Sequence, residues 1–294
     1  PDLFPVKAEG SDDTKWVMLV SINPGGPNGG SATQYFTGKF NGKKFIPDEK
    51  VTKFIDWGTD NYAGVTWSGI PETDSRRLFL GWMSNWNYAT VVPTVVWRSA
   101  MTIPRELILS SENGKYFLIS RPVSELTILR KESKSIIRGK TVSSSDADLI
   151  IEEQGLNQSE IEFEFKIPAG DNDSLGIILE NNMGEILIIG YSVAAKHIFI
   201  DRTKSGETYF SERFAGVATS PYESGKTLKM HLFIDASSVE LFIDEGKLVM
   251  TSLFFPAERY SKLRFISKSP SSYPEMIRYY EFKSIWTEKS KLQF

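Results

Sequence analysis

Apolar and polar residues alternate with a period of two in the second half of the chain. Residues 159–167 read SEIEFEFKI, which places Ile161, Phe163, Phe165 and Ile167 on one face, the pattern of a half-buried strand. Turn sequences such as 181–184 and 244–246 divide this half into many short segments. Such strands joined by turns predict a two-sheet β-sandwich. Its further strands are expected at 175–179, 185–190, 197–201, 228–235, 239–243, 248–253 and 278–286.

Short apolar segments set between glycine, proline and asparagine turns make up the first 110 residues. Residues 15–21 (KWVMLVS) are the first predicted strand, and 34–40 with 44–46 predict a hairpin. Strands at 62–67 and 77–82 follow. Because helical patterns are few, this half favours an all-β propeller or sandwich over an α/β fold.

Composition narrows the function classes. The 294 residues carry a formal net charge of -3, which argues against a nucleic-acid or anionic-membrane partner. No apolar run approaches the roughly 20 residues that span a bilayer. Cysteine is absent, so disulfides and thiolate metal sites are excluded. His197 and His231 stand without an acidic or histidine neighbour at ligand spacing, so no metal site is predicted.

The stretch 78–109 carries the candidate chemistry. A predicted buried strand ends at Trp82, and a loop follows in which Ser84, Asn85 and Asn87 alternate with Trp86 and Tyr88. Aromatic rings stack on the apolar face of a sugar, and amides bind its hydroxyls. The alternative is that these rings fill the core of a β-protein. Their clustering with asparagine favours a sugar-binding site.

The stretch 78–109 contains a run of short motifs: 81–89 (GWMSNWNYA), Pro93-Thr94, Trp97-Arg98, Met101 and 104–107 (PREL). These motifs resemble the signature of glycoside hydrolase family 32, which contains invertases, inulinases and levanases. Residues 21–36 and 56–63 (DWGTDNYA) support the match, although phenylalanine usually occupies the position of Asn61 in the family. Weaker resemblance extends over most of the rest of the chain, including 235–246.

The resemblance implies an all-β fold: the later blades of a five-bladed β-propeller followed by a C-terminal β-sandwich. The expected division is a partial propeller at 1–115, a connector at 116–130 and the sandwich at 131–294. It implies a retaining fructan hydrolase that releases fructose from levan, inulin or sucrose without a cofactor or metal. The parent protein is expected to be secreted or periplasmic. The sandwich is expected to support the propeller rather than to bind sugar.

The catalytic carboxylates of the family are not found in this sequence. The family's acid is a glutamate just before a Cys-Pro-Asp-Leu-Phe segment, and 1–4 (PDLF) resembles the end of that segment. Its nucleophile and its transition-state stabiliser lie in Asn-Asp-Pro and Arg-Asp-Pro motifs, and the chain contains no Asp-Pro. We therefore expect no catalytic residue among these 294 residues and no activity from the chain alone. A glutamate two positions before Pro1 is the expected acid.

By resemblance, Trp82 forms a wall of the pocket for the terminal fructose, while Asp60 and Asp2 bind hydroxyls or orient catalytic groups. The alternative for Asp60 is a turn carboxylate that accepts backbone N–H bonds, and Asp2 is liable to fray. Asp56 and Asp60 could be misread as an acid/base pair, but carboxylates are common in turns beside glycine, so neither is expected to act as an acid or a base.

Two acidic or glycine-rich segments invite other interpretations. The loop 23–30 (NPGGPNGG) lacks the spacing and lysine of a phosphate cradle and is expected to be a wide surface turn. Residues 171–173 (DND) lack the later residues of a calcium loop and are expected to form a turn.

The expected ligand is fructan or sucrose. Open strand edges favour self-association or pairing with the missing N-terminal half. Two further classes stay open: a non-catalytic carbohydrate-binding module and a purely structural β-protein.

Overall fold

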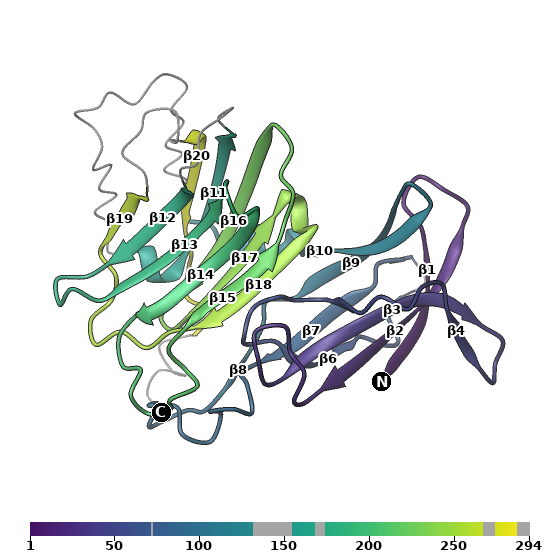
Figure 1. Ribbon diagram of the computed structural model, residues 1–294, viewed down its shortest axis with the longest axis horizontal. Helices are drawn as coiled ribbons and strands as arrows, with labels where there is room; N and C mark the ends of the chain where they lie inside the picture. The colour runs from purple at the N-terminus through teal and green to yellow at the C-terminus, as the bar shows by residue number, and fades with distance from the viewer. Residues whose placement is uncertain (72, 132–154, 168–173, 267–273, 287–294) are drawn as a thin grey trace.

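Antiparallel sheets dominate the computed structural model, which describes residues 1–71, 73–131, 155–167, 174–266 and 274–286. Within these ranges the chain forms four sheets of five strands each. Figure 1 shows two of them at the N-terminal end of the molecule and two at the C-terminal end. The described helices are the short 3-10 turns η1 (Ser124–Leu129), η3 (Leu156–Gln158) and η4 (Asp244–Gly246).

The first 122 residues supply sheets 1 and 2, in which the main strands follow one another in sequence. Sheet 1 has the order β1-β2-β3-β4 with β5 against β3, and sheet 2 has the order β10-β9-β7-β6 with β8 against β7. Sheet 1 comprises β1 (Asp2–Lys7), β2 (Thr14–Ile22), β3 (Ala32–Phe40), β4 (Phe45–Pro47) and β5 (Lys53–Phe54). Sheet 2 comprises β6 (Tyr62–Thr66), β7 (Leu78–Met83), β8 (Ala100–Met101), β9 (Arg105–Glu112) and β10 (Lys115–Pro122).

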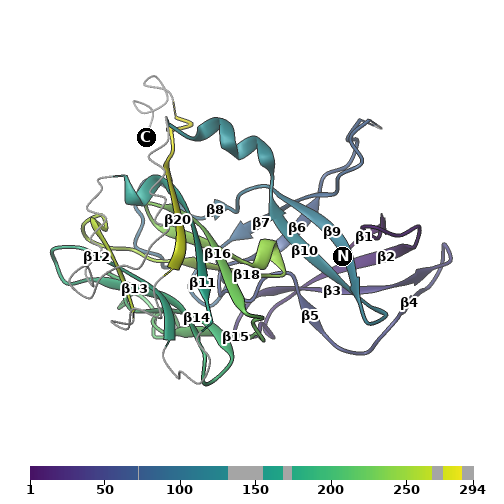
Figure 2. The same ribbon diagram turned by 90° about the horizontal axis from the view of Figure 1, so that it is seen from above.

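A shared apolar cluster joins sheets 1 and 2. Leu19 of β2 and Leu109 of β9 are almost fully buried in it, together with Phe79 of β7. Apolar side chains therefore meet between the two sheets, which stabilises each through the burial of the other. β10 pairs with β9 from Lys115 to Pro122, so this segment belongs to sheet 2, and η1 then leads to the C-terminal sheets (Figure 2).

Sheets 3 and 4 are formed by the rest of the chain. Their orders are β18-β17-β16-β11-β20 and β15-β14-β13-β12-β19. Sheet 3 comprises β11 (Ser159–Lys166), β16 (Thr227–Asp235), β17 (Ser238–Ile243), β18 (Leu248–Leu253) and β20 (Pro274–Glu281). Sheet 4 comprises β12 (Ser174–Glu180), β13 (Ile186–Ser192), β14 (His197–Lys204), β15 (Val217–Pro221) and β19 (Lys262–Phe265).

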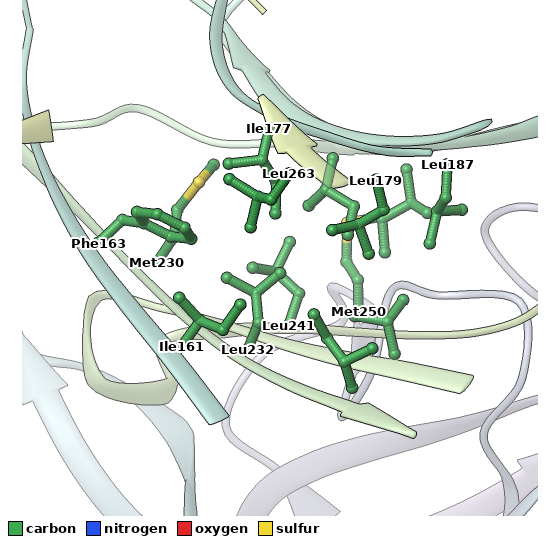
Figure 3. Close-up of a cluster of buried hydrophobic side chains, with 14 of the residues drawn as sticks. Ile161, Phe163, Ile177, Leu179, Leu187, Met230, Leu232, Leu241, Met250 and Leu263 are labelled. Carbon is green, nitrogen blue, oxygen red and sulfur yellow. The ribbon is translucent and has the colours of Figure 1, made fainter. Parts of the chain in front are cut away.

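The largest apolar core lies between sheets 3 and 4. In Figure 3, Ile161, Phe163 and Leu241 of sheet 3 face Ile177 and Leu187 of sheet 4. All five side chains are at most 1% exposed. The predicted alternation along β11 is confirmed at Ile161, Phe163 and Phe165, which are buried while the intervening Glu162 and Glu164 are less so.

Most predicted strands are confirmed, with shifts of a few residues at their ends. The strand predicted at 15–21 is β2, and the predicted hairpin is β3 and β4, closed by Asn41, whose Oδ1 accepts from the Lys43 and Lys44 amides. The last strand was predicted at 278–286, whereas β20 begins at Pro274 and ends at Glu281. The 171–173 segment lies outside the described residues. Among the described residues, no helix is long and apolar enough to cross a membrane.

Truncation in this core tests its contribution to stability. Leu241→Ala removes buried methyl groups from a site with 0% exposure, so we expect a loss of about 2–5 kcal/mol in the free energy of unfolding. Chemical denaturation followed by tryptophan fluorescence measures it. The matched Val217→Ala change, at a side chain that is 50% exposed, should cost less than about 1 kcal/mol. Equal losses in the two variants would contradict this assignment of the core.

Candidate functional site

Three aromatic rings form an open surface at one end of β6 and β7. Tyr62 and Trp82 are paired across these strands, and their ring centroids lie 6.1 Å apart. The Trp86 ring lies 5.1 Å from that of Trp82 and is 52% exposed. On the other side Trp82 pairs with Met101 of β8, which is also exposed. The predicted clustering of rings is therefore present, with Trp86 exposed and Tyr62 and Trp82 half-buried, and an exposed ring can stack on a sugar.

Asn85 holds the Trp86 loop in place from below. Its Oδ1 accepts from the amides of Ser31 and Asn87, and its Nδ2 donates to the Thr59 carbonyl at 2.8 Å. Ser31 Oγ in turn accepts from the Trp86 amide at 3.0 Å. A Cβ at Gly30 would lie 2.1 Å from Asn85 Oδ1, so only glycine permits this approach. The glycine-rich loop thus supports the aromatic loop, in addition to forming a turn.

The sequence predicted that the polar side chains of this loop bind sugar hydroxyls, but not all of them are available to do so. Ser84 and Asn85 are each 1% exposed, and the polar atoms of Asn85 are used in bonds within the protein. Asn87 is half-buried and accepts a bond from Arg213 Nη1 at 3.2 Å. In this loop Trp86 is therefore the exposed ring, and Asn87 is the amide that stays partly exposed.

Asp60 lies beneath this loop and is 0% exposed. Its Oδ1 accepts from the Tyr88 hydroxyl at 2.6 Å, and its Oδ2 accepts from Arg202 Nη1 at 2.7 Å and from the Leu253 amide at 2.9 Å. Arg202 belongs to β14 of sheet 4, so this ion pair crosses from the N-terminal to the C-terminal sheets. The backbone bond expected of a turn carboxylate is present, although its donor is 193 residues away in the sequence.

Ionisation in this cluster follows from its burial and its charges. Burial raises the pKa of the Tyr88 hydroxyl, so that group stays protonated and donates to Asp60. Burial opposes the charge on Arg202, but Tyr88 and Asp60 more than offset it and raise its pKa. Arg202 therefore remains a cation that fixes both side chains.

Asp56 belongs to a second buried cluster. Its Oδ2 accepts from Arg105 Nη1 at 2.9 Å and from Thr251 Oγ1 at 2.6 Å, while its Oδ1 accepts from the Thr251 amide. Arg105 also pairs with Glu240 of β17. Asn61 donates to Asp56 at 3.3 Å and fills the space beside Gly81. Burial lowers the pKa of Arg105, but the two carboxylates raise it by more.

Both members of the apparent acid/base pair are thus engaged in buried ion pairs. Asp56 is 2% exposed and Asp60 is 0% exposed, and each contacts an arginine. A general acid or base must reach the proton that it transfers. Neither carboxylate is placed to do so, and both instead join the two pairs of sheets.

Asp2 lies toward the opposite end of β6. Its Oδ2 accepts from the backbone amide and the hydroxyl of Thr66 at 2.8 and 2.7 Å, and Asp2 is paired with Leu19 in sheet 1. Thr66 lies four positions after Tyr62 in β6, a span of about 13 Å in a strand. The structure therefore places Trp82 and Asp60 in one neighbourhood and Asp2 apart from them.

His231 does have acidic neighbours, contrary to the expectation from its sequence spacing. Its Nε2 lies 2.7 Å from Glu160 Oε1, and Glu162 completes a group whose ligand atoms lie within 4.8 Å of one another. Adjacent strands β11 and β16 bring them together. However, Arg130 binds both oxygens of Glu160, and Arg278 binds Glu162. With two guanidinium groups already neutralising the carboxylates, the donor set does not suit a further cation.

Comparison with protein families places this chain. Residues 1–122 match the model of the glycosyl hydrolases family 32 N-terminal domain, and residues 125–280 match that of the family 32 C-terminal region. The chain belongs to glycoside hydrolase family 32. This family 32 chain is 37% identical over 292 residues to a levanase of Bacillus subtilis, covering 97% of the chain and 43% of the relative. It is 33% identical over 304 residues to the extracellular exo-inulinase of Aspergillus niger, covering 97% and 55%.

Solved structures of the family share the fold. The exo-inulinase from Aspergillus awamori matches with a TM-score of 0.83 and 31% identity over 97% of this chain and 57% of that one. The β-fructofuranosidase from Schwanniomyces occidentalis complexed with fructosyl-erythritol matches with a TM-score of 0.80 and 27% identity, over 96% and 59%. This family 32 chain therefore spans about half the length of the curated relatives it matches.

Removing the shared arginine tests the buried cluster. Arg105→Ala leaves Asp56 and Glu240 buried without their cation, so we expect a loss of about 3–5 kcal/mol in the free energy of unfolding. The control is Lys196→Ala, which breaks the exposed pair with Glu223 and should change the stability little, because water and salt screen an exposed ion pair. Denaturant titration of both proteins measures the difference. An Arg105→Ala protein as stable as the control would refute the structural role given to this cluster.

Proposed function

We propose that this family 32 chain is the part of a retaining β-fructosidase that positions the sugar. The whole enzyme releases fructose from levan, inulin or sucrose. The observation that carries the proposal is that the family motif at 81–89 exposes the Trp86 ring beside the half-buried Trp82 ring, on a loop that Asn85 holds in place. The levanase and exo-inulinase names of the relatives support a fructan as substrate.

We propose that sheets 1 and 2 are two blades of a five-bladed β-propeller, and that sheets 3 and 4 form the C-terminal β-sandwich. The sequential strand order of sheets 1 and 2, and the core enclosed by sheets 3 and 4, support this division. Because β10 pairs with β9 as far as Pro122, we place the end of the propeller portion there rather than at residue 115. η1 then serves as the connector.

The role of Trp82 is to form a wall on which the apolar face of the terminal fructose stacks. Asp2 lies apart from Trp82, so it orients a neighbouring catalytic group or binds a sugar hydroxyl at the far side of the site, through the carboxylate oxygen that does not accept from Thr66. Asp60 acts indirectly, because its carboxylate holds Tyr88 and the loop that carries Trp86. These residues fix the sugar in position, which is a large part of glycosidase catalysis.

Retention of configuration requires two carboxyl groups about 5–5.5 Å apart on either side of the scissile bond. The chain contains no Asp-Pro, and Asp56 and Asp60 are buried in ion pairs. We therefore infer that the nucleophile, the transition-state stabiliser and the acid come from outside these 294 residues. The chain alone then binds sugar without hydrolysing it.

Fructose release tests this proposal directly. The purified chain is assayed on levan, inulin and sucrose beside a fusion in which the preceding part of the Bacillus subtilis levanase is joined to Pro1. We expect no release from the chain alone and release from the fusion, because the fusion restores the family's carboxylates. Release by the chain alone would refute the inferred absence of catalytic groups. A monodisperse, cooperatively unfolding fusion that releases no fructose would refute the proposed function.

Within the active fusion, Trp82→Ala should lower kcat/KM by on the order of tenfold or more, because a stacking surface for the reacting sugar is lost. Trp67→Ala is the control, since this indole is 44% exposed and follows the end of β6 remote from Tyr62. Steady-state kinetics on sucrose and inulin measure both variants. Equal activity of the two variants would remove Trp82 from the site.

A further inference from the structure

Tyr209 is exposed to an unusual degree on the long loop between β14 and β15. Its side chain is 97% exposed, whereas tyrosine is usually at least partly buried. The loop around it is nevertheless anchored. Thr208 is buried, and the Phe210 ring packs 4.5 Å from that of Phe214 and 5.6 Å from that of Phe255. The ring of Tyr209 is therefore presented to solvent by a loop that is held on both sides.

This loop lies against the loop that carries Trp86. The Phe210 ring is 6.4 Å from that of Tyr88, and Arg213 Nη1 donates to Asn87 Oδ1 at 3.2 Å. Further along, Asn28 exchanges two hydrogen bonds with the Thr219 backbone at 3.0 and 2.9 Å. The loop that carries Tyr209 is thus held in direct contact with the loop that carries Trp86.

The kinds of side chain on these two loops indicate which ligand they bind. The two loops expose the rings of Trp86 and Tyr209, and they also carry the half-buried Asn87 and the exposed Glu212 and Arg213. A protein partner would favour a contiguous apolar patch. Separate flat rings interleaved with hydrogen-bonding groups instead suit a neutral chain of sugars, each ring taking the apolar face of one unit.

We propose that Trp86 and Tyr209 form an outer platform for the units of a fructan chain beyond the terminal fructose held at Trp82. This inference rests on the proposed function and deepens it, because the platform distinguishes a polymer from a disaccharide. Sucrose ends before it reaches Tyr209, whereas a longer levan or inulin chain extends across it. The C-terminal sheets then contribute to substrate choice in addition to supporting the fold.

Affinity electrophoresis of the 294-residue chain in gels containing levan or inulin tests the platform, with a fluorescence titration by fructose alongside. We expect the polysaccharide to retard the wild-type chain, and Tyr209→Ala to raise the apparent Kd by on the order of fivefold. Tyr209→Phe keeps the ring and should bind like the wild type. Trp67→Ala, an exposed aromatic outside the platform, is the control. Fructose affinity should be the same in all four proteins.

Three results would overturn the platform: no retardation of the wild type, unchanged retardation of Tyr209→Ala, or equal losses for fructose and polymer. The fusion described above separates this failure from failure of the proposed function. If the fusion releases fructose while Tyr209→Ala leaves polymer binding unchanged, the platform is wrong and the proposed function stands. If the folded fusion releases none, the proposed function fails whatever the gels show.

Discussion

Two buried arginines determine how the N-terminal and C-terminal sheets meet. Arg105 of sheet 2 reaches Glu240 of sheet 3 and also binds Asp56, and Arg202 of sheet 4 reaches Asp60. A charge removed from water is tolerated only when its partners are placed to satisfy it. The sheets therefore have one arrangement in which all five groups are paired. The aromatic loop inherits its position from this arrangement, because Asp60 and Arg202 both bind the Tyr88 hydroxyl.

The alternation of apolar and polar residues was enough to predict most strands and the core-facing side of each. The alternation at Ile161, Phe163 and Phe165 correctly identified residues of the core between sheets 3 and 4. In β17 the same alternation puts Glu240 and Phe242 on the face opposite Leu241, yet both are at most 2% exposed. Period-two alternation separates the two faces of a strand but does not say what covers the second one. Here Arg105, 135 residues away in the sequence, covers it.

The candidate site shows the same limit at the level of single side chains. Trp86 and Asn85 are neighbours in one loop, but the first is 52% exposed and the second 1%. Sequence predicted a cluster of rings and amides and could not assign which groups face a ligand. The Asn85 side chain is bonded to backbone groups of four other residues, a role set mainly by tertiary contacts. Tyr209 and Arg202 carried no local signal, because only the folding of sheet 4 against the other sheets brings them near the loop.

The cross-sheet ion pairs also limit how such a protein can be recombined. Exchanging the C-terminal sheets between family members would keep Asp56, Asp60 and Arg105 but would replace Glu240 and Arg202, which pair with them. Only a donor that supplies a carboxylate at the position of Glu240 and a cation at that of Arg202 avoids a buried, unpaired charge. The two halves are therefore not interchangeable modules. A recombination point between them keeps the protein stable only if the charged residues on both sides still pair.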